Sequence, residues 1–126
     1  MQYQTERFDK YTLLTIQTER LATSTATTLK ADIAQLFNEE GVVNMIIDMS
    51  NVNYIDSSGL SAILVANRLA NEAGGMLVLS GITELVMKII TICRLDNVFT
   101  MMPTVAEGVD AIFLNQMERD LSNEEG

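Results

Sequence analysis

The stretch Val52-Asn53-Tyr54-Ile55-Asp56-Ser57-Ser58-Gly59-Leu60 decides the fold, because an extended apolar segment runs there directly into a helix. Residues 60–73 contain no proline or glycine and carry apolar residues at helical spacing. The start of a helix offers free N–H groups and a partial positive charge, so it holds an added phosphate at little cost. A serine at this junction is therefore well placed to act as a switch.

Length and composition predict one packed domain. The chain has 126 residues, of which 48% are hydrophobic and only one is proline, and this composition favours a globule over a disordered regulator. No apolar run is long enough to cross a bilayer, and the N-terminus lacks the basic and then apolar pattern of a signal peptide. The sequence thus predicts a cytoplasmic protein with no membrane insertion.

Charge and missing residue types exclude several classes of function. A formal net charge of −9 argues against binding to nucleic acid, which requires basic patches. Histidine is absent, and with it the commonest general base near neutral pH and the commonest nitrogen ligand for metals. We therefore expect no enzyme, no catalytic residue, no cofactor and no metal site. Cys93 is the single cysteine, and its apolar neighbours predict a buried thiol.

Strands and helices are predicted to alternate after a first hairpin. The pattern favours strands over residues 2–8, 11–17, 42–48, 76–79 and 98–101 and helices over 58–73, 82–94 and 105–117. A further helix starts after a loop at 19–22, is capped by Thr23, Ser24 or Thr25, and ends at Glu39-Glu40-Gly41. We expect an α/β fold with a mixed sheet of four to five strands, covered by about four helices. The domain would span 1–117, followed by a solvated, frayed acidic tail over 118–126.

The central motif belongs to a longer pattern. The run Ile46-Ile47-Asp48-Met49-Ser50-Asn51-Val52-Asn53-Tyr54-Ile55-Asp56-Ser57-Ser58-Gly59-Leu60 resembles the signature of the STAS family. That family contains antagonists of anti-sigma factors and cytoplasmic domains of sulfate transporters. The resemblance extends through Met76-Leu77-Val78-Leu79-Ser80-Gly81-Ile82 to Val105-Ala106-Glu107-Gly108-Val109-Asp110-Ala111, and so covers nearly the whole chain.

The resemblance implies a phosphorylation switch. In the family, the second serine of such a motif is phosphorylated by a partner that is both anti-sigma factor and kinase. This marks Ser58 as the phosphoacceptor, with Ser57 as the second choice. Asp56 would shape the loop and cap the helix, and Gly59 would leave room for the kinase. Asp48 matches an acid that is frequent in the family at the end of the preceding strand, but we expect it only to order the Ser50-Asn51 turn.

The resemblance also implies partners and a docking surface. The unphosphorylated protein would bind an anti-sigma factor with serine kinase activity and so release a sigma factor, while ATP would belong to the partner and a phosphoserine phosphatase would reset the switch. The expected contact residues are Asp56, Ser57, Gly59, Leu60, Ser61, Ala22 and Thr23. The alternative is a STAS interaction subunit of a transporter-associated or stress-signalling complex, which involves no sigma factor.

Three positions depart from the family pattern. Glu19 stands where glycine is usual, Ala22 where an acid is usual, and Arg94 where glycine usually precedes the leucine after the third helix. The first two lie in the loop expected beside the switch serine, so they bear on partner identity.

The helix over 58–73 is also unusually apolar around its circumference. Burial within the monomer and contact with a partner both account for this pattern.

Overall fold

Strands and helices alternate along residues 2–125, the part of the chain that this computed structural model describes. In chain order they are β1 (Tyr3–Arg7), β2 (Thr12–Ile16), β3 (Arg20–Leu21), α1 (Thr23–Asn38), β4 (Met45–Asp48), β5 (Tyr54–Ile55), α2 (Ser57–Glu72), β6 (Leu77–Ser80), α3 (Glu84–Ile92), β7 (Thr100–Met102) and α4 (Val105–Glu125).

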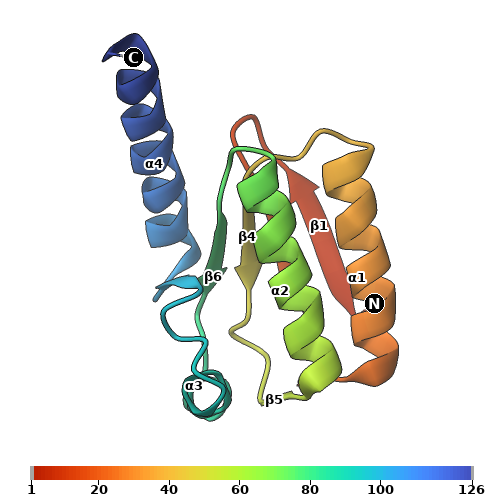
Figure 1. Ribbon diagram of the computed structural model, residues 1–126. Helices are drawn as coiled ribbons and strands as arrows, with labels where there is room; N and C mark the ends of the chain where they lie inside the picture. Colours follow the sequence, from red (N-terminus) through yellow and green to blue (C-terminus); the bar gives the residue numbers. More distant parts are fainter. Residues whose placement is uncertain (1, 126) are drawn as a thin grey trace.

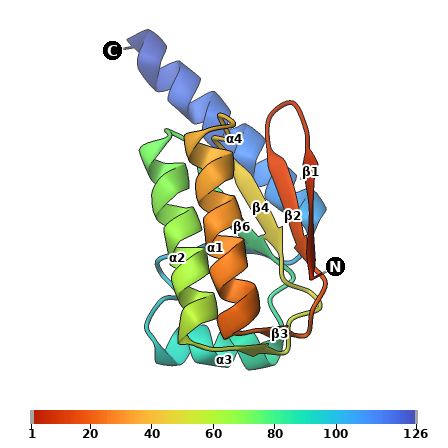
Figure 2. The same ribbon diagram turned by 90° about the vertical axis from the view of Figure 1, so that its right-hand side faces the viewer.

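The main sheet has five strands in the order β1-β2-β4-β6-β7. β1 and β2 form an antiparallel hairpin, and the remaining neighbours pair in parallel. α1 and α2 cover one face of this sheet, α4 lies on the other, and α3 runs across the lower end (Figures 1 and 2). The predicted α/β fold with a mixed sheet and four helices is confirmed.

β4 is the central strand and is buried on both faces. Met45, Ile46 and Ile47 are each 0% exposed. Successive side chains of a strand point to opposite faces. Met45 and Ile47 join the core beneath α1 and α2, whereas Ile46 packs with Val78 and Ile112 beneath α4. The apolar run predicted as a central strand is therefore confirmed, although the strand begins at Met45, three positions after Val42.

The apolar surface of α2 is largely used inside the monomer. Its buried residues are Gly59, Leu60, Ala62, Ile63, Ala66, Leu69 and Ala70. They pack against the sheet and against α1, which lies alongside α2 (Figure 2). Leu64 remains exposed. Of the two explanations for this apolar helix, burial in the monomer accounts for most of its side chains.

A second, two-stranded sheet lies where the sequence predicted a loop. Arg20–Leu21 forms β3 and pairs in parallel with β5, and the Arg20 guanidinium stacks over the Tyr54 ring at 4.1 Å from its centroid. Only two residues take part in each strand, so no hydrophobic period marks the pairing in the sequence. This small sheet holds the start of α1 beside the start of α2.

Several predicted details are wrong. None of the three predicted residues caps α1, because its N-cap is Ala22 and no side chain bonds there. Cys93 is exposed, since it ends α3 at the surface. α4 continues as a helix to Glu125, so the predicted frayed tail from Glu118 is helical up to that residue, and Gly126 lies outside the described residues. The proposed division into a domain over 1–117 and a tail over 118–126 stays a prediction.

Among residues 2–125, no helix combines the length and the apolar character needed to cross a membrane.

α2 and α3 end in the same motif but with different residues. After α2, Gly74 has φ +83° and donates to the Asn71 carbonyl at 3.1 Å, while Gly75 donates to Ala70 at 2.9 Å. After α3, Arg94 has φ +59° and donates to the Thr91 carbonyl at 3.0 Å. This is the Schellman geometry, which favours glycine at the left-handed position. Arg94 therefore holds a strained conformation where the family usually has glycine.

Replacing Arg94 with glycine should stabilise the fold. Arg94→Gly removes the clash of a Cβ atom with the left-handed backbone, and we expect the free energy of unfolding to rise by about 1 kcal/mol. Urea denaturation measures the change. The matched control is Gly74→Ala, which should lower the free energy of unfolding by about 1 kcal/mol, since alanine meets the same strain there. An unchanged or reduced stability of Arg94→Gly would contradict the strain assigned to this residue.

Candidate functional site

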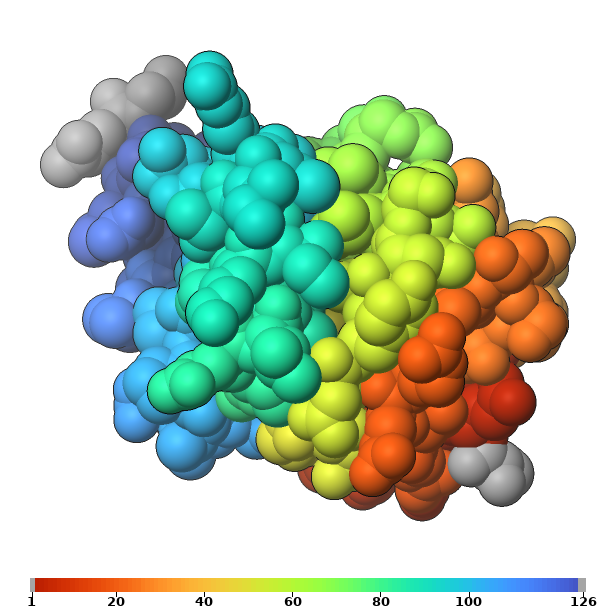
Figure 3. Space-filling view, turned by 90° about the horizontal axis from the view of Figure 1, so that it is seen from below, coloured from red at the N-terminus to blue at the C-terminus, as the bar shows by residue number. Residues whose placement is uncertain are grey.

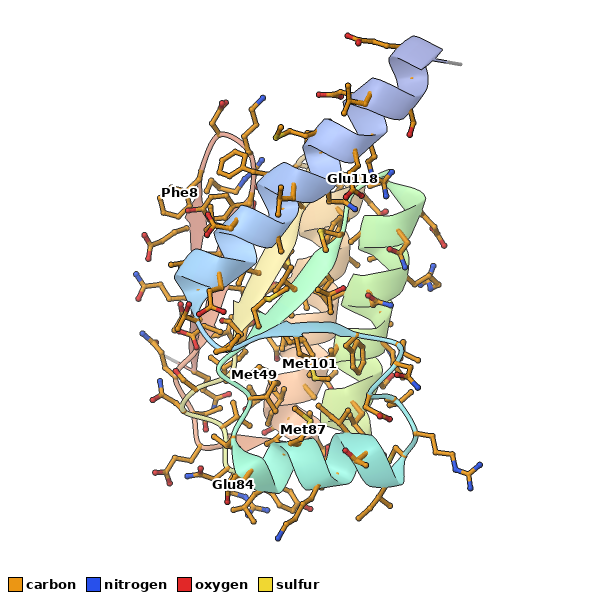
Figure 4. The ribbon with its side chains drawn as sticks, turned by 90° about the vertical axis from the view of Figure 1, so that its left-hand side faces the viewer. Phe8, Met49, Glu84, Met87, Met101 and Glu118 are labelled. Carbon is orange, nitrogen blue, oxygen red and sulfur yellow. The ribbon has the colours of Figure 1, made fainter. Side chains whose placement is uncertain are left out.

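The candidate site lies at the carboxyl end of the parallel strands, where β5 leads into α2. Viewed from below, this end of the molecule shows α3 beside the start of α2 and the segment around β3 (Figure 3). Met49, Met87 and Met101 lie between α3 and the strands of the sheet, at this end of the hydrophobic core (Figure 4). The motif over 56–59 lies at this end of the domain, where Ser57 is exposed and Asp56 and Ser58 are half-buried.

Asp56 organises the first turn of α2. It is the N-cap of the helix, and its Oδ1 accepts a hydrogen bond from the Gly59 N–H at 3.0 Å. Its Oδ2 accepts one from the Thr23 hydroxyl at 3.3 Å, which joins the start of α1 to the start of α2. The predicted cap is confirmed. Thr23 does not cap α1, because its hydroxyl is directed to this carboxylate.

These hydrogen bonds hold the pKa of the Asp56 carboxyl below its ordinary value. The Gly59 N–H contributes most, and partial burial opposes it; the Thr23 hydroxyl and the Ser58 and Thr23 N–H groups also favour the charged form. A carboxyl with a lowered pKa stabilises the fold above its unfolded-state pKa. That contribution is lost as the pH falls through the lower pKa of the folded state. At neutral pH Asp56 is therefore a fixed negative charge beside the serines.

Ser57, Ser58 and Ser61 line an open depression of about 320 Å³ between α1 and α2, together with Ala26, Thr27 and Lys30 of α1. Ser57 is exposed, and Ser58 and Ser61 are half-buried. Ser58 occupies the second position of α2, inside the turn whose N–H groups have no carbonyl partner in the helix. The structure therefore places a reachable serine at a helix start, as the sequence predicted.

Lys30 is a site residue that sequence reasoning missed. Its ammonium group donates a hydrogen bond to the Ser61 hydroxyl at 3.0 Å. Lys30 lies in α1, one turn after Ala26 and Thr27, so it reaches the serines only because α1 packs alongside α2. No local pattern in the sequence signals this proximity. The lysine brings a positive charge to a depression that otherwise carries hydroxyl groups.

Gly59 and Leu60 lie beneath this surface, both buried. A Cβ atom at position 59 would lie 2.4 Å from the Leu21 carbonyl oxygen and 2.6 Å from Cγ1 of Ile55. The space at this glycine is thus filled by the protein interior. The expectation that Gly59 leaves room for an approaching kinase is wrong in its physical reason, because the glycine admits the β3 backbone instead.

Asp48 and the loop before α1 shape the surroundings. Asp48 Oδ1 accepts the Ser50 N–H at 3.0 Å, so its predicted role in ordering the turn is confirmed. The Glu19 carbonyl accepts the N–H groups of Asn53 and Tyr54 at 2.8 and 3.1 Å, and the residue itself is exposed. Ala22, where the family usually has an acid, leaves the start of α1 without a side-chain cap.

The close approach at Gly59 predicts a stability effect. Gly59→Ala should lower the free energy of unfolding by about 2 kcal/mol, because the added methyl group overlaps the Leu21 backbone. Ser57→Ala is the matched control. Ser57 lies in the same turn of α2 but is exposed, so its substitution should change the free energy of unfolding by less than about 0.5 kcal/mol. Chemical denaturation of both variants decides the point. Equal stabilities would mean that the β3 backbone does not rest on this glycine.

Comparison with known proteins identifies the class of protein. A family model described as STAS domain matches residues 2–108. The chain therefore belongs to the STAS domain family.

Solved structures give the same fold. The anti-sigma factor antagonist SpoIIAA in its unphosphorylated form has a TM-score of 0.70 at 19% identity, covering 87% of this chain and 96% of that one. SpoIIAA from Bacillus in its phosphorylated form gives 0.71 at 20% identity, covering 87% and 98%. An anti-sigma factor antagonist from Mycobacterium paratuberculosis gives 0.74 at 20%, covering 87% and 92%. A variant of RsbS from Moorella thermoacetica gives 0.76 at 20%, covering 94% and 99%. At these identities the likeness shows the fold alone.

Proposed function

We propose that this protein is an anti-sigma factor antagonist whose binding to its partner is switched by phosphorylation of Ser58. The observation that carries the proposal is the position of Ser58: it is the second residue of α2 and lines an open depression that Lys30 also lines. A related structure has been solved in both phosphorylated and unphosphorylated forms, and this supports a modification that the fold tolerates.

The phosphorylated protein should remain folded. A phosphate on Ser58 would lie at the positive end of α2, near its free N–H groups. The Lys30 ammonium, already bonded to Ser61, would offset part of the added negative charge. Asp56 opposes the phosphate as a fixed like charge, but its carboxylate is engaged with the Gly59 N–H and the Thr23 hydroxyl. The helix start and Lys30 would therefore offset part of the added charge within the monomer.

An interface with an acidic partner would lack this compensation. Phosphorylation adds close to two negative charges. If a carboxylate or nucleotide phosphate of the partner lies about 6 Å away, at an effective dielectric of about 40, the repulsion is roughly 2–3 kcal/mol. That corresponds to about a hundredfold loss of affinity. The switch would thus act through local charge and bulk, with no large rearrangement of the fold.

The partner we propose is an anti-sigma factor with serine kinase activity, which supplies the ATP. Ser57 and Ser61 line the depression, and Asp56 caps the helix that carries them. Thr23 donates to Asp56, and Ala22 precedes Thr23 at the start of α1. Gly59 and Leu60 support this surface from inside. A phosphoserine phosphatase would restore the binding form, and the whole cycle would take place in the cytoplasm without a catalytic residue in this chain.

Variants of Ser58 test the switch. Ser58→Ala should bind the anti-sigma factor within about twofold of wild type, whereas Ser58→Glu should bind at least about tenfold more weakly, since glutamate adds one charge where phosphate adds nearly two. Isothermal titration calorimetry gives the affinities, and thermal unfolding checks that both variants fold. The matched control is Ser57→Glu, which should weaken binding less. Wild-type affinity for a folded Ser58→Glu would refute the charge switch.

The role of Lys30 has a separate readout. In protein carrying phosphoserine at position 58, a nearby ammonium group favours the dianion and lowers the pKa of the phosphate. Lys30→Gln should therefore raise that pKa by about half a unit from its value near 6. ³¹P NMR titration follows the change. Lys10→Gln, in the hairpin turn at the opposite end of the molecule (Figure 1), should leave it unaltered. The same pKa in both variants would remove Lys30 from the phosphate site.

The alternative function, a subunit of a transporter-associated or stress-signalling complex, predicts a different partner. A pull-down with wild-type protein and Ser58→Glu as paired baits separates the two. Recovery of a small ATP-binding kinase by wild type and not by Ser58→Glu supports the proposed switch. A membrane ATPase recovered equally by both baits would favour the alternative.

A further inference from the structure

α4 presents the same side to the rest of the protein along its length, but the residues on that side change from apolar to polar after Ile112. In its first half, Gly108 and Ile112 are buried, and Ile112 packs with Ile46 of β4 and Val78 of β6. Val105 and Val109 lie half-buried around the same small core. This half is an ordinary amphipathic helix with its apolar side on the sheet.

Beyond Ile112 the side of α4 that faces the body is polar. Asn115, Gln116, Glu118, Arg119, Ser122 and Asn123 line an open cavity of about 570 Å³ together with Gly74. The Arg119 guanidinium donates to the Gly75 carbonyl at 3.3 Å and to Asn115 Oδ1 at 2.9 Å. The second half of the helix therefore presents its hydrogen-bonding side chains to the domain, not its apolar ones.

The apolar side chains of this second half face solvent. Phe113, Leu114, Met117 and Leu121 are 43%, 60%, 60% and 58% exposed, and we call these four residues the α4 stripe. Their spacing of three, four and seven positions places them on one side of a helix. α4 runs past the end of the sheet here, and its last turns stand clear of the domain (Figures 1 and 4). Nothing in residues 2–125 covers the stripe.

Acidic residues surround the stripe. Glu118 and Asp120 lie on its two sides by helical spacing, and Asp110 and Glu124 lie along it toward either end; all four are exposed. The one cation of this region is Arg119, which is turned to the body. The stripe is thus an apolar strip, one helix wide, with a negative border.

We propose that the α4 stripe binds an amphipathic helix of a partner protein whose apolar side is bordered by lysine and arginine. Apolar residues at this spacing match the ridge of a second helix. The negative border requires a positive one opposite, because like charges across an interface weaken it.

The acidic residues that border the α4 stripe also disfavour two other ligands at this surface. A second copy would bring Glu118, Asp120 and Glu124 of both chains together around the paired stripes, where their like charges repel. An anionic membrane surface would place its own negative charge against the same carboxylates.

This surface is separate from the Ser58 site. The start of α2 lies at the lower end of the molecule in Figure 1, and the free end of α4 lies at the upper end. A helix bound to the stripe would leave Ser58 accessible, so the protein could hold one partner while the other is exchanged. The proposal stands whether or not Ser58 is phosphorylated.

Designed peptides provide the test. The probe is a helical peptide with leucines at positions i, i+3, i+4 and i+7 and lysines on both borders, labelled for fluorescence anisotropy and titrated with the full chain. We expect saturable binding by wild type. The triple variant Leu114→Gln/Met117→Gln/Leu121→Gln should bind at least about tenfold more weakly. The matched control is Leu85→Gln/Ile92→Gln on α3, whose leucine and isoleucine are also exposed, and it should bind as wild type does.

A second variant separates charge from fold. Glu118→Lys/Asp120→Lys/Glu124→Lys keeps the stripe and changes only exposed side chains. It should lose at least about tenfold affinity for the lysine-bordered peptide and gain affinity for the same peptide with glutamates in place of lysines. Equal binding of either peptide by all variants, or no binding by wild type, would overturn the proposal. Dimerisation in analytical ultracentrifugation that the triple glutamine variant abolishes would assign the stripe to a second copy instead, and so would also overturn it.

Discussion

The contact between the first turn of α2 and the backbone of β3 is the constraint on which the site depends. Gly59 has no side chain, so the Leu21 carbonyl can lie where a Cβ atom would otherwise be. This approach aligns the starts of α1 and α2, which lets Thr23 reach Asp56 and Lys30 reach Ser61. A larger residue at position 59 would move the starts of α1 and α2 apart, so the depression between them would lose its shape. The chemistry of the surface thus rests on a packing requirement beneath it.

Charge is distributed differently at the two ends of the molecule. At the lower end, the free N–H groups of α2 and the Lys30 ammonium place positive charge beside the Asp56 carboxylate in a chain of net charge −9. Under the proposed switch, the monomer would tolerate a phosphate on Ser58, and the phosphorylated site would then repel a negatively charged partner. At the upper end, the α4 stripe is bordered by carboxylates and has no cation directed outward. As proposed, the two surfaces would select partners of different charge, and their separation would allow both to be occupied.

Much of the architecture was predictable from local patterns. The apolar run of β4 indicated a strand buried on both faces, and the motif over 56–59 indicated a capped helix start, because both signals lie in consecutive residues. The misses share a cause. β3 is two residues long, Lys30 acts from another helix, and Cys93 is exposed because α3 ends at the surface, so each depends on how elements pack. The reversed amphipathicity of α4 was hidden for the same reason, since only the sheet beneath it shows which side faces inward.

The sequence by itself determined the α/β class, the order of the principal elements and the serine at the mouth of α2, because hydrophobic period and capping residues act over short distances in the chain. Only the tertiary structure decided what surrounds that serine and which apolar side chains remain uncovered. The depression requires α1 and α2 to lie side by side, and the α4 stripe exists because the helix outruns the sheet that buries its first half. Both are consequences of long-range packing, which no local pattern of residues encodes.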